Sequence, residues 1–478
     1  MPDHVFEDNS NTMHDDRNIY KDRGADIMKY IKCIDLGIPG IERLFLECPY
    51  GTTILIKGER GLGKTFMGIH FIERSLVAGE EVIYINFFEN KEEFLWKASS
   101  IGIDLKDYMD SKLHYFQKSV YSEKSQLLYF VSVIQETIRA RKIKRVVIDT
   151  IDALTAVLTG EEYRVFILEL MQRIKELGAT LLIIKDVGIE DRRYGYEEVI
   201  ADIIIELMRK RGPHYETRYL MVTKSRYASY IPIPVEYTIT SGGVQVYPPY
   251  RYTQSYQGVI SSERIPTGIP KLDEILDGGI PANSIVCIKG PTGTYKTLLA
   301  LSIAAYNASK GKKVMLSSYK ESREQLLHYL KILGYDYNSL KNNLSITSIN
   351  PIYISPARLY AILIRLLEEG GYDIRIADGA EASLKFMDED ERTFFTHSIL
   401  QAIKAMGVTE IIVYNQDKEY YIDEYSLDYI ADVVIATRIN EKLGSIRKEI
   451  AILKNRGNPI KDHGFHEIEF YEGKLVVK

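Results

Sequence analysis

The segment Gly58–Thr65, GERGLGKT, carries residue types that can bind phosphate groups. It fits the spacing GxxxxGK[ST] and lies between an apolar run and a segment typical of a helix. Glycines let successive backbone N–H groups turn onto phosphate oxygens, and the helix N-terminus adds its positive end. Lys64 would reach the β- and γ-phosphates of a nucleotide, and Thr65 would bind Mg²⁺. We expect an ATP site formed by Gly58, Glu59, Arg60, Gly61, Leu62, Gly63, Lys64 and Thr65.

A second loop, Gly290–Thr297, has the sequence GPTGTYKT, in which Tyr295 precedes the lysine where the first loop has glycine. A positive φ would cost a tyrosine roughly 1–2 kcal/mol, which is small beside the contacts of a triphosphate. The ring must also point away from the phosphates. We expect that ATP binding is kept, and the alternative is a decayed pocket with a structural role only. The residues concerned are Gly290, Pro291, Thr292, Gly293, Thr294, Tyr295, Lys296 and Thr297.

Two aspartates follow runs rich in valine and isoleucine. Asp149 ends RVVID and Asp378 ends IRIAD. A carboxylate at the end of a strand, beside a phosphate loop, suits the Mg²⁺ shell. We predict that Asp149 acts with Thr65, and Asp378 with Thr297.

The elements that position these residues occur twice. Lys64 and Lys296 lie 232 residues apart, and Asp149 and Asp378 lie 229 apart. Short apolar runs alternate with amphipathic segments in each copy, which predicts the α/β class with a mostly parallel β-sheet flanked by helices. We expect a flexible acidic tail (1–28), a first domain (29–248), a linker (249–262) and a second domain with an altered phosphate loop (263–478).

Several motifs together resemble the KaiC branch of the RecA superfamily, from about Lys29 to Lys478. They are TGIPKLDEILDGGIP, GPTGTYKT, the Asp-ended strand, YIADVVI and KNRG. The resemblance implies two tandem RecA-like domains of P-loop NTPase architecture, a homohexameric double ring and ATP between subunits. It also implies that a Lys–Arg pair of each domain reaches the neighbouring subunit's phosphates. Those trans fingers are Lys224 and Arg226 in the first domain, where Tyr227 replaces a glycine of the motif, and Lys454 and Arg456 in the second.

The family usually has adjacent glutamates after the strand that follows the first helix, and the first of them activates the attacking group. Here the pairs read Phe88–Glu89 and Lys320–Glu321. A positioned base contributes roughly 10²–10⁴ in rate. We therefore expect ATP binding with slow or lost hydrolysis, unless Glu89 or Glu321 takes over as the catalytic base. Phe88 is expected in the core.

Some members of that family phosphorylate a Ser-Thr pair, and the corresponding positions here are Asp428 and Tyr429. Clock-type autokinase activity is not expected. Tyr429 is a conceivable acceptor, and Asp428 could imitate a permanently phosphorylated residue.

The composition narrows the classes of function. The net charge is −5, which argues against a protein that coats nucleic acid. The three cysteines form no CxxC, so we expect reduced thiols. No apolar run reaches the roughly 18 residues of a membrane span, and the N-terminus lacks the pattern of a signal peptide. We expect a cytoplasmic protein that needs no membrane.

These observations favour a KaiC-like ATP-binding protein, acting as a slow ATPase or a nucleotide-dependent assembly switch in signalling. It would assemble with itself as a homohexamer and bind a protein partner of unknown identity, and nucleic acid is not expected. One alternative is a RecA/RadA-type DNA-dependent ATPase, either recombinase or helicase. Another is a scaffold whose non-catalytic second domain uses some of the 35 tyrosines to bind a partner.

Overall fold

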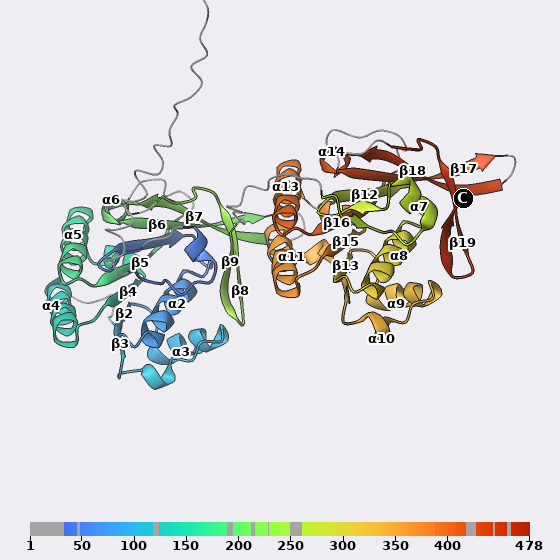
Figure 1. The fold of residues 1–478 in the computed structure, drawn as a ribbon. Coiled ribbons are helices and arrows are strands. Elements are labelled where there is room, and N and C mark those ends of the chain that lie inside the picture. Colours follow the sequence, from blue (N-terminus) through green and yellow to red (C-terminus); the bar gives the residue numbers. More distant parts are fainter. Residues whose placement is uncertain are drawn as a thin grey trace, which may run out of the picture. The chain divides into compact units, whose positions relative to one another are not determined.

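The computed structural model describes residues 33–44, 48–117, 124–188, 195–211, 216–227, 229–248, 261–385, 387–416, 427–442, 445–456 and 460–478. The chain divides into two units, the first reaching Pro248 and the second holding the described residues from 261 onward (Figure 1). The expected tail (1–28) and residues 249–260 of the expected linker lie outside the described residues. Each unit is described by itself.

The first unit is built on a nine-stranded sheet with the order β3-β2-β4-β5-β1-β6-β7-β8-β9. Strands β3 to β6 of that order pair in parallel, and β6 to β9 pair antiparallel. The strands are β1 (Thr53–Gly58), β2 (Val82–Asn86), β3 (Leu113–Gln117), β4 (Arg145–Asp149), β5 (Thr180–Asp186), β6 (Ile203–Arg211), β7 (Glu216–Ser225), β8 (Val235–Thr240) and β9 (Gly243–Tyr247). The helices are η1 (Ile41–Arg43), α2 (Lys64–Val77), α3 (Lys91–Ser100), η2 (Lys106–Tyr108), α4 (Lys124–Arg141), η3 (Ile151–Ala156), α5 (Gly160–Glu176) and α6 (Tyr196–Ile200).

The second unit repeats this order as β14-β13-β15-β16-β12-β17-β18-β19-β20. Its strands are β12 (Ile285–Gly290), β13 (Val314–Ser318), β14 (Leu344–Ser348), β15 (Ile374–Asp378), β16 (Thr409–Asn415), β17 (Val433–Lys442), β18 (Ser445–Asn455), β19 (His466–Tyr471) and β20 (Lys474–Val477), beside a small pair of strands, β10 (Arg264–Ile265) and β11 (Ile280–Pro281). Its helices are α7 (Pro270–Ile275), α8 (Lys296–Ser309), α9 (Arg323–Ile332), α10 (Tyr337–Leu340), η4 (Pro351–Tyr353), α11 (Pro356–Gly370), α12 (Glu381–Leu384), α13 (Glu389–Ala405) and α14 (Leu427–Ile430).

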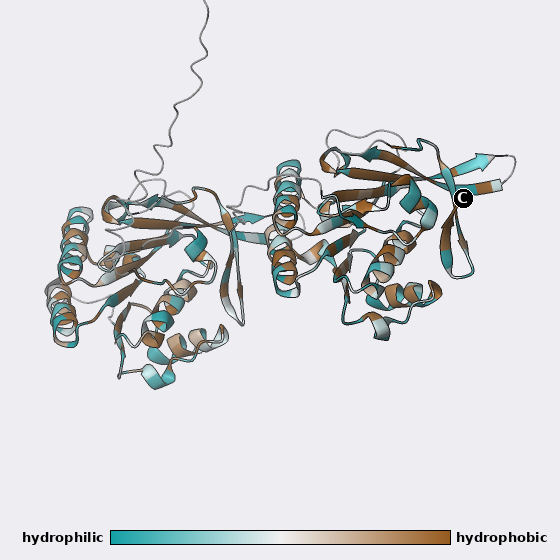
Figure 2. Cartoon of the chain, in the orientation of Figure 1, coloured by the Kyte–Doolittle hydropathy of each residue, from teal (hydrophilic) through white to brown (hydrophobic). Residues whose placement is uncertain are grey.

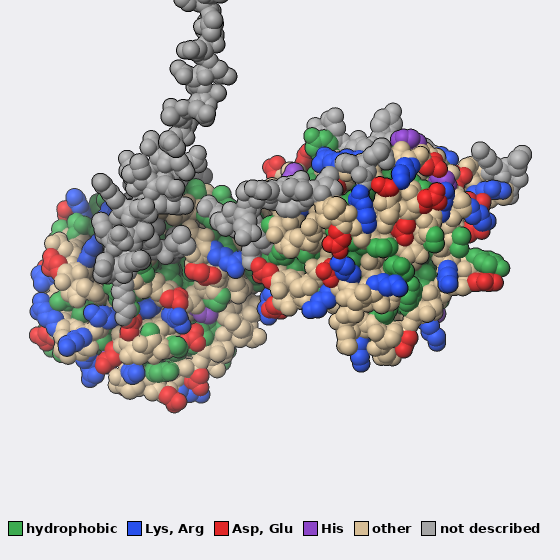
Figure 3. Space-filling model, in the orientation of Figure 1, with side chains coloured by type: hydrophobic (Ala, Val, Ile, Leu, Met, Phe, Trp, Pro, Cys, Tyr) green, Lys and Arg blue, Asp and Glu red, His purple; other side chains and the backbone are tan. Residues whose placement is uncertain are grey.

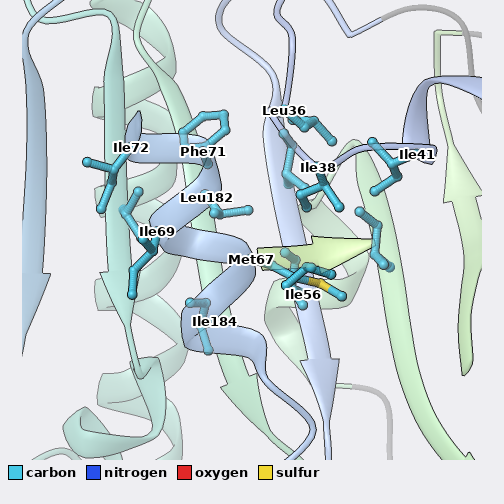
Figure 4. Packing of buried hydrophobic residues seen from close by; sticks show 14 of the residues in the cluster. Leu36, Ile38, Ile41, Ile56, Met67, Ile69, Phe71, Ile72, Leu182 and Ile184 are labelled. Atoms are coloured by element: carbon cyan, nitrogen blue, oxygen red, sulfur yellow. The ribbon is translucent and has the colours of Figure 1, made fainter. Parts of the chain in front are cut away.

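Burial on both faces explains why the central strands read as nearly continuous apolar runs. In β1, Ile56 faces a cluster that holds α2 and α3, whereas Leu55 faces a cluster that holds α4 and α5. The hydropathy colouring shows these brown strands between helices with one brown and one teal face (Figure 2). In close-up, Met67 and Phe71 of α2 pack with Ile56 and Leu182 of the sheet (Figure 4). The predicted fold, two tandem α/β domains of RecA type, is confirmed.

The parallel strands bring their carboxyl ends to one edge of the sheet. Gly58 at the end of β1 pairs with Asp186 at the end of β5, and Asn86 at the end of β2 pairs with Asp149 at the end of β4. Ligands of open α/β sheets bind outside such ends. No described helix is long and apolar enough to cross a bilayer. No disulfide joins the three cysteines, all of which the structure describes.

Candidate functional site

The loop between β1 and α2 has the backbone shape that its glycines permit. Gly63 has φ 86°, in the left-handed region, and a Cβ there would lie 2.2 Å from Cδ1 of Ile239 on β8. The Tyr237 hydroxyl, also on β8, donates a hydrogen bond of 2.6 Å to the Leu62 carbonyl. The antiparallel part of the sheet therefore packs directly against the phosphate loop and holds its conformation.

Lys64 at the start of α2 is buried and fully engaged within its own site. Its Nζ donates to the carbonyl oxygens of Gly58 and Glu59, at 2.7 Å each, and lies 2.8 Å from Oδ1 of Asp186. The other oxygen of Asp186 accepts from Nε of Arg60 at 3.0 Å. Sequence reasoning did not select Asp186. It could have been found in the same way as Asp149, because it too is a carboxylate that ends an apolar strand.

A cavity of about 560 Å³ opens at this edge of the first sheet. Its walls carry the phosphate loop, three carboxylates and three cations. They include Arg60, Gly61, Gly63, Lys64, Thr65, Phe66, Asn86, Phe88, Glu89, Lys97, Asp149 and Asp186. The structure thus brings the predicted loop, Glu89 and Asp149 together around one space, as an ATP site would require.

Asp149 lies at the base of this space and is almost completely buried. Burial raises its pKa to about 6, although hydrogen bonds from the hydroxyls of Thr65 and Tyr84 lower it in part. The Tyr84 hydroxyl lies 2.9 Å from Oδ2 of Asp149. A buried carboxylate next to a threonine hydroxyl offers the hard oxygen donors that Mg²⁺ prefers, so these residues fit the ion.

Glu89 lies after the end of β2. Its backbone N–H donates to Oδ1 of Asn86 at 2.7 Å, and its Oε1 is paired with Nζ of Lys97 on α3. Its Oε2 is buried and, among the described residues, has no hydrogen-bond partner. A carboxylate oxygen with spare acceptor capacity beside a phosphate cavity is suited to orient a water molecule.

The expectation for Phe88 is wrong. The side chain is 63% exposed and lines the cavity, while the preceding aromatic, Phe87, is buried in the core. The cause lies in the turn after β2, where the Asn86 side chain accepts from the backbone N–H groups of both Phe88 and Glu89. That turn directs Phe88 outward.

The second loop keeps the backbone of the first despite its tyrosine. Tyr295 has φ 67° and ψ 15°, close to the φ 86° and ψ 24° of Gly63. Its ring packs against the edge of the core, with Nζ of Lys448 on β18 3.5 Å from the ring centroid. The ring is therefore directed toward the antiparallel strands.

The groups around the second loop also match those of the first. Lys296 Nζ donates to the Pro291 carbonyl at 2.6 Å. The hydroxyls of Thr297 and Ser318 donate to the two oxygens of Asp378, at 3.1 and 3.0 Å. Burial raises the pKa of Asp378, and these two hydrogen bonds lower it in part. At the end of β16, Asn415 occupies the position that Asp186 has in the first domain.

The two residues after β13 differ in their contacts. Lys320 forms an ion pair with Glu381 on α12. The backbone N–H of Glu321 donates to Oγ of Ser318 at 3.1 Å, and the Glu321 charge contributes to the raised pKa of Asp378. Glu321 therefore lies near the predicted metal ligand.

The Lys–Arg pairs lie at the other edge of each sheet. Lys224 pairs in register with Ile204 near the start of β6, whereas Gly58 pairs with Leu207 farther along the same strand. Lys454 pairs with Val434 near the start of β17 in the same way. The structure thus does not bring either pair to the phosphate loop of its own domain.

Both Lys–Arg pairs donate hydrogen bonds to backbone carbonyls of a short helix, α6 in the first domain and α14 in the second. Lys224 Nζ donates to the carbonyls of Glu198 and Val199 at 2.9 and 3.0 Å, and Arg226 also donates to Val199 at 3.0 Å. In the second domain, Lys454 donates to the carbonyls of Asp428 and Tyr429 at 3.1 and 3.0 Å, and Arg456 donates to that of Tyr429 at 3.5 Å.

Asp428 is completely buried, where Lys289 of β12 and the hydroxyl of Tyr414 on β16 bind its two oxygens. A side chain held in this way cannot present its charge as a surface phosphate does, which argues against the imitation considered from sequence. Tyr429 is 59% exposed.

The fold and the two loops define an ATPase of the P-loop, RecA-like class. Residues 34–251 and 265–478 each match the family model of the KaiC ATPase domain, and the chain belongs to this family. It is similar to the circadian clock oscillator protein KaiC of Acaryochloris marina, at 27% identity over 455 residues, which cover 90% of this chain and 85% of that protein. KaiC of Synechococcus elongatus is 26% identical over 436 residues, covering 86% and 82%. The circadian clock protein KaiC2 of a Synechocystis strain is 30% identical over 321 residues, covering 65% and 56%.

Proposed function

We propose that this protein binds MgATP in both domains and acts as a slow ATPase or a nucleotide-dependent assembly switch in cytoplasmic signalling. The observation that carries the proposal is the placement of each phosphate loop at one edge of its sheet and of each Lys–Arg pair at the other. Such a site is complete only when a second copy of the chain supplies the pair.

In the first site, the loop N–H groups and Lys64 would hold the phosphates. Thr65 and Asp149 would hold Mg²⁺, which supplies neutralisation of phosphate charge when bound. Arg226 of a neighbouring copy would clamp the phosphate oxygens, because its planar fork stays charged and donates in two directions. Glu89 would orient the attacking water through Oε2, while Lys97 holds the other oxygen.

In the second site, Lys296, Thr297, Asp378 and a neighbour's Arg456 would have the same roles. Lys320 occupies the position of the first glutamate of the family's pair, the catalytic base, and it forms an ion pair with Glu381. We infer that the second site turns over more slowly than the first and serves mainly to hold nucleotide.

We include self-assembly into a homohexameric ring in the proposal, because a head-to-tail contact between loop and finger generates a ring when the rotation between neighbouring subunits closes. A protein partner would read the assembly state. Figure 3 shows Lys and Arg side chains interspersed with Asp and Glu over the visible faces of both units, which does not favour the DNA-dependent alternative.

The first experiment follows assembly and the γ-phosphate together. Native mass is measured with and without MgATP, and γ-labelled ATP is incubated with the protein, Lys64→Ala and Lys296→Ala. We expect nucleotide-dependent assembly and slow release of labelled phosphate that Lys64→Ala abolishes. Unchanged mass together with no retained nucleotide would overturn the proposal, and label on the protein would indicate an autokinase instead.

A further inference from the structure

A lysine immediately precedes each phosphate loop. Its side chain contacts the short helix whose backbone carbonyls accept hydrogen bonds from the Lys–Arg pair. Lys57 directly precedes Gly58, and its Nζ lies 3.0 Å from Oε2 of Glu198 on α6. Both side chains are largely buried. The backbone carbonyl of Glu198 is one of the acceptors that hold Lys224. One residue of α6 thus contacts the loop strand through its side chain and the predicted finger through its backbone.

A second attachment holds α6 from the neighbouring strand. Lys185 on β5 lies 3.2 Å from Oε2 of Glu197, and the Tyr163 hydroxyl donates to the other oxygen. Lys185 directly precedes Asp186, the carboxylate that pairs with Lys64. The two lysines that contact α6, Lys57 and Lys185, therefore each directly precede a residue of the phosphate site, Gly58 and Asp186.

The second domain repeats the arrangement with changed side chains. Lys289 directly precedes Gly290 and pairs with Asp428 on α14, whose carbonyl accepts from Lys454 at 3.1 Å. Glu198 and Asp428 occupy matching positions, three residues before the alanine of each IAD sequence. The lysine is retained while the carboxylate differs in length, so the ion pair is common to both domains although their loops differ.

The burial of the Lys57–Glu198 ion pair does not by itself indicate that the pair is there to stabilise the fold. Taking two charges out of water costs free energy, and their attraction repays that cost only with excellent geometry and additional hydrogen bonds. Burial opposes the charge of Lys57, yet the hydrogen bond to Glu198 and the nearby carboxylate of Glu206 raise its pKa above the ordinary value. Lys57 is thus a fixed cation, held between the loop strand and α6.

We propose that Lys57 and Lys289 are positioning residues that hold α6 and α14, and through them the trans fingers, in the geometry that a neighbouring copy's nucleotide requires. A chain would thereby transmit the state of its own loop strand to the finger it offers to its neighbour. This inference rests on the proposed function, because it assumes that Arg226 and Arg456 act on the next subunit.

The test measures assembly separately from nucleotide binding, in the full-length protein. The MgATP concentration at half-maximal assembly is determined by light scattering, and ATP affinity is determined by equilibrium dialysis on dilute protein. Arg226→Ala and Lys57→Met are each expected to raise the half-assembly concentration at least tenfold. Lys57→Met should leave the affinity of the dilute chain within threefold, and Lys57→Arg should assemble almost as the unaltered protein does.

Two further variants separate positioning from a folding defect. Lys57→Met/Glu198→Leu replaces the ion pair by apolar side chains, so the chain should fold stably and still assemble poorly. Lys57→Met added to Arg226→Ala should cause no further loss, since both act through the same finger.

The outcomes distinguish the positioning role of Lys57 from the action of Arg226 as a trans finger. Normal assembly of Lys57→Met/Glu198→Leu, with impaired assembly of Arg226→Ala, would overturn the positioning role alone. Normal assembly of Arg226→Ala would overturn the trans finger itself. An additive loss in the combined variant would show that Lys57 acts elsewhere and would also overturn the inference.

Discussion

The ammonium group of Lys448 lies over the ring of Tyr295, with 3.5 Å between Nζ and the ring centroid. A glycine occupies this position in the first domain, and a Cβ there would collide with Ile239. In the second domain, the β19–β20 hairpin pairs with β18 through two described residue pairs, Glu449 with Glu467 and Ile450 with His466. In the first domain, β8 of the β8–β9 hairpin pairs with β7 through three. The different packing of this hairpin accompanies the tyrosine in the phosphate loop.

Two replacements of Tyr295 separate the free-energy cost of its left-handed backbone conformation from the contribution of its ring to stability. Tyr295→Ala and Tyr295→Gly both remove the ring, but alanine keeps the unfavourable left-handed conformation. We expect Tyr295→Ala to be less stable than Tyr295→Gly by about 1 kcal/mol. Urea unfolding of the full chain, followed by circular dichroism, measures the difference. Equal stability of the two variants would mean that the loop relaxes to another conformation.

Asp186 is paired with Lys64 and would compete with a nucleotide's phosphates for its ammonium group. Asp186→Asn should therefore tighten ATP binding at the first site about three- to tenfold, a modest effect because the carboxylate is partly exposed and screened. The second domain offers the matched control, since Asn415→Asp should weaken ATP binding there by a similar factor. Titration of labelled ATP on Lys296→Ala and Lys64→Ala backgrounds isolates each site. A loss of affinity in Asp186→Asn would instead indicate that the carboxylate helps to bind MgATP.

Glu89 is the predicted base of the first site. Glu89→Gln keeps the size of the side chain and removes its basicity, so phosphate release should fall about 10²–10³-fold while ATP affinity stays the same. Lys97→Met should lower the rate, because the carboxylate loses the ion pair that holds it beside the cavity. Glu321→Gln serves as the control in the second domain. Unchanged phosphate release from Glu89→Gln would move the role of the base to another group.

A buried ion pair between Arg375 and Glu410 distinguishes the interior of the second domain. The matching cross-strand pair in the first domain is Val146 and Leu181. Glu410→Leu should destabilise the fold by about 3–5 kcal/mol, because arginine cannot lose its proton to become neutral. Arg375→Val should cost less, since Glu410 can take up a proton. The double change to valine and leucine should restore most of the stability, which thermal unfolding would show.

The same pair predicts a pH dependence. Burial raises the pKa of Glu410 from 4.5 to about 7, although Arg375 lowers it in part. The folded state therefore binds the proton more tightly than the unfolded chain, and stability should fall as pH rises from about 4.5 to about 7. Tyr319, which accepts from Arg375 at 3.3 Å, stays protonated over this range because burial raises its pKa. Comparison of unfolding curves for the protein and Glu410→Gln isolates the contribution, and identical slopes would contradict it.

The sequence predicted the features that local spacing controls. Glycine spacing predicted both phosphate loops, and the Asp-ended strands predicted that Asp149 and Asp378 lie near them. The structure places each aspartate at the carboxyl end of its sheet with the loop, because the strands around it, β1, β2, β4 and β5 or β12, β13, β15 and β16, are parallel. The repeat offset correctly predicted two tandem domains, and the structure gives both of them the same strand order. These inferences needed no knowledge of side-chain contacts.

Features that depend on three-dimensional contacts were missed. The exposure of Phe88 is set by the Asn86 turn, and hydropathy alone favoured burial. The pairing of Asp428 with Lys289 joins residues 139 positions apart in the sequence. Asp186 and Lys97 gain their relevance only because the folded sheet brings them to the same cavity.

The register of β7 has a consequence for how the protein would respond to its own abundance. Ser225 is level with Ile203 and with Ile54, four residues before Gly58, so roughly 13 Å of strand separates the finger from its own loop. A single chain cannot close that distance with one side chain. If the fingers act as proposed, dilution alone would inactivate the protein, and its cellular concentration would be an input as decisive as ATP.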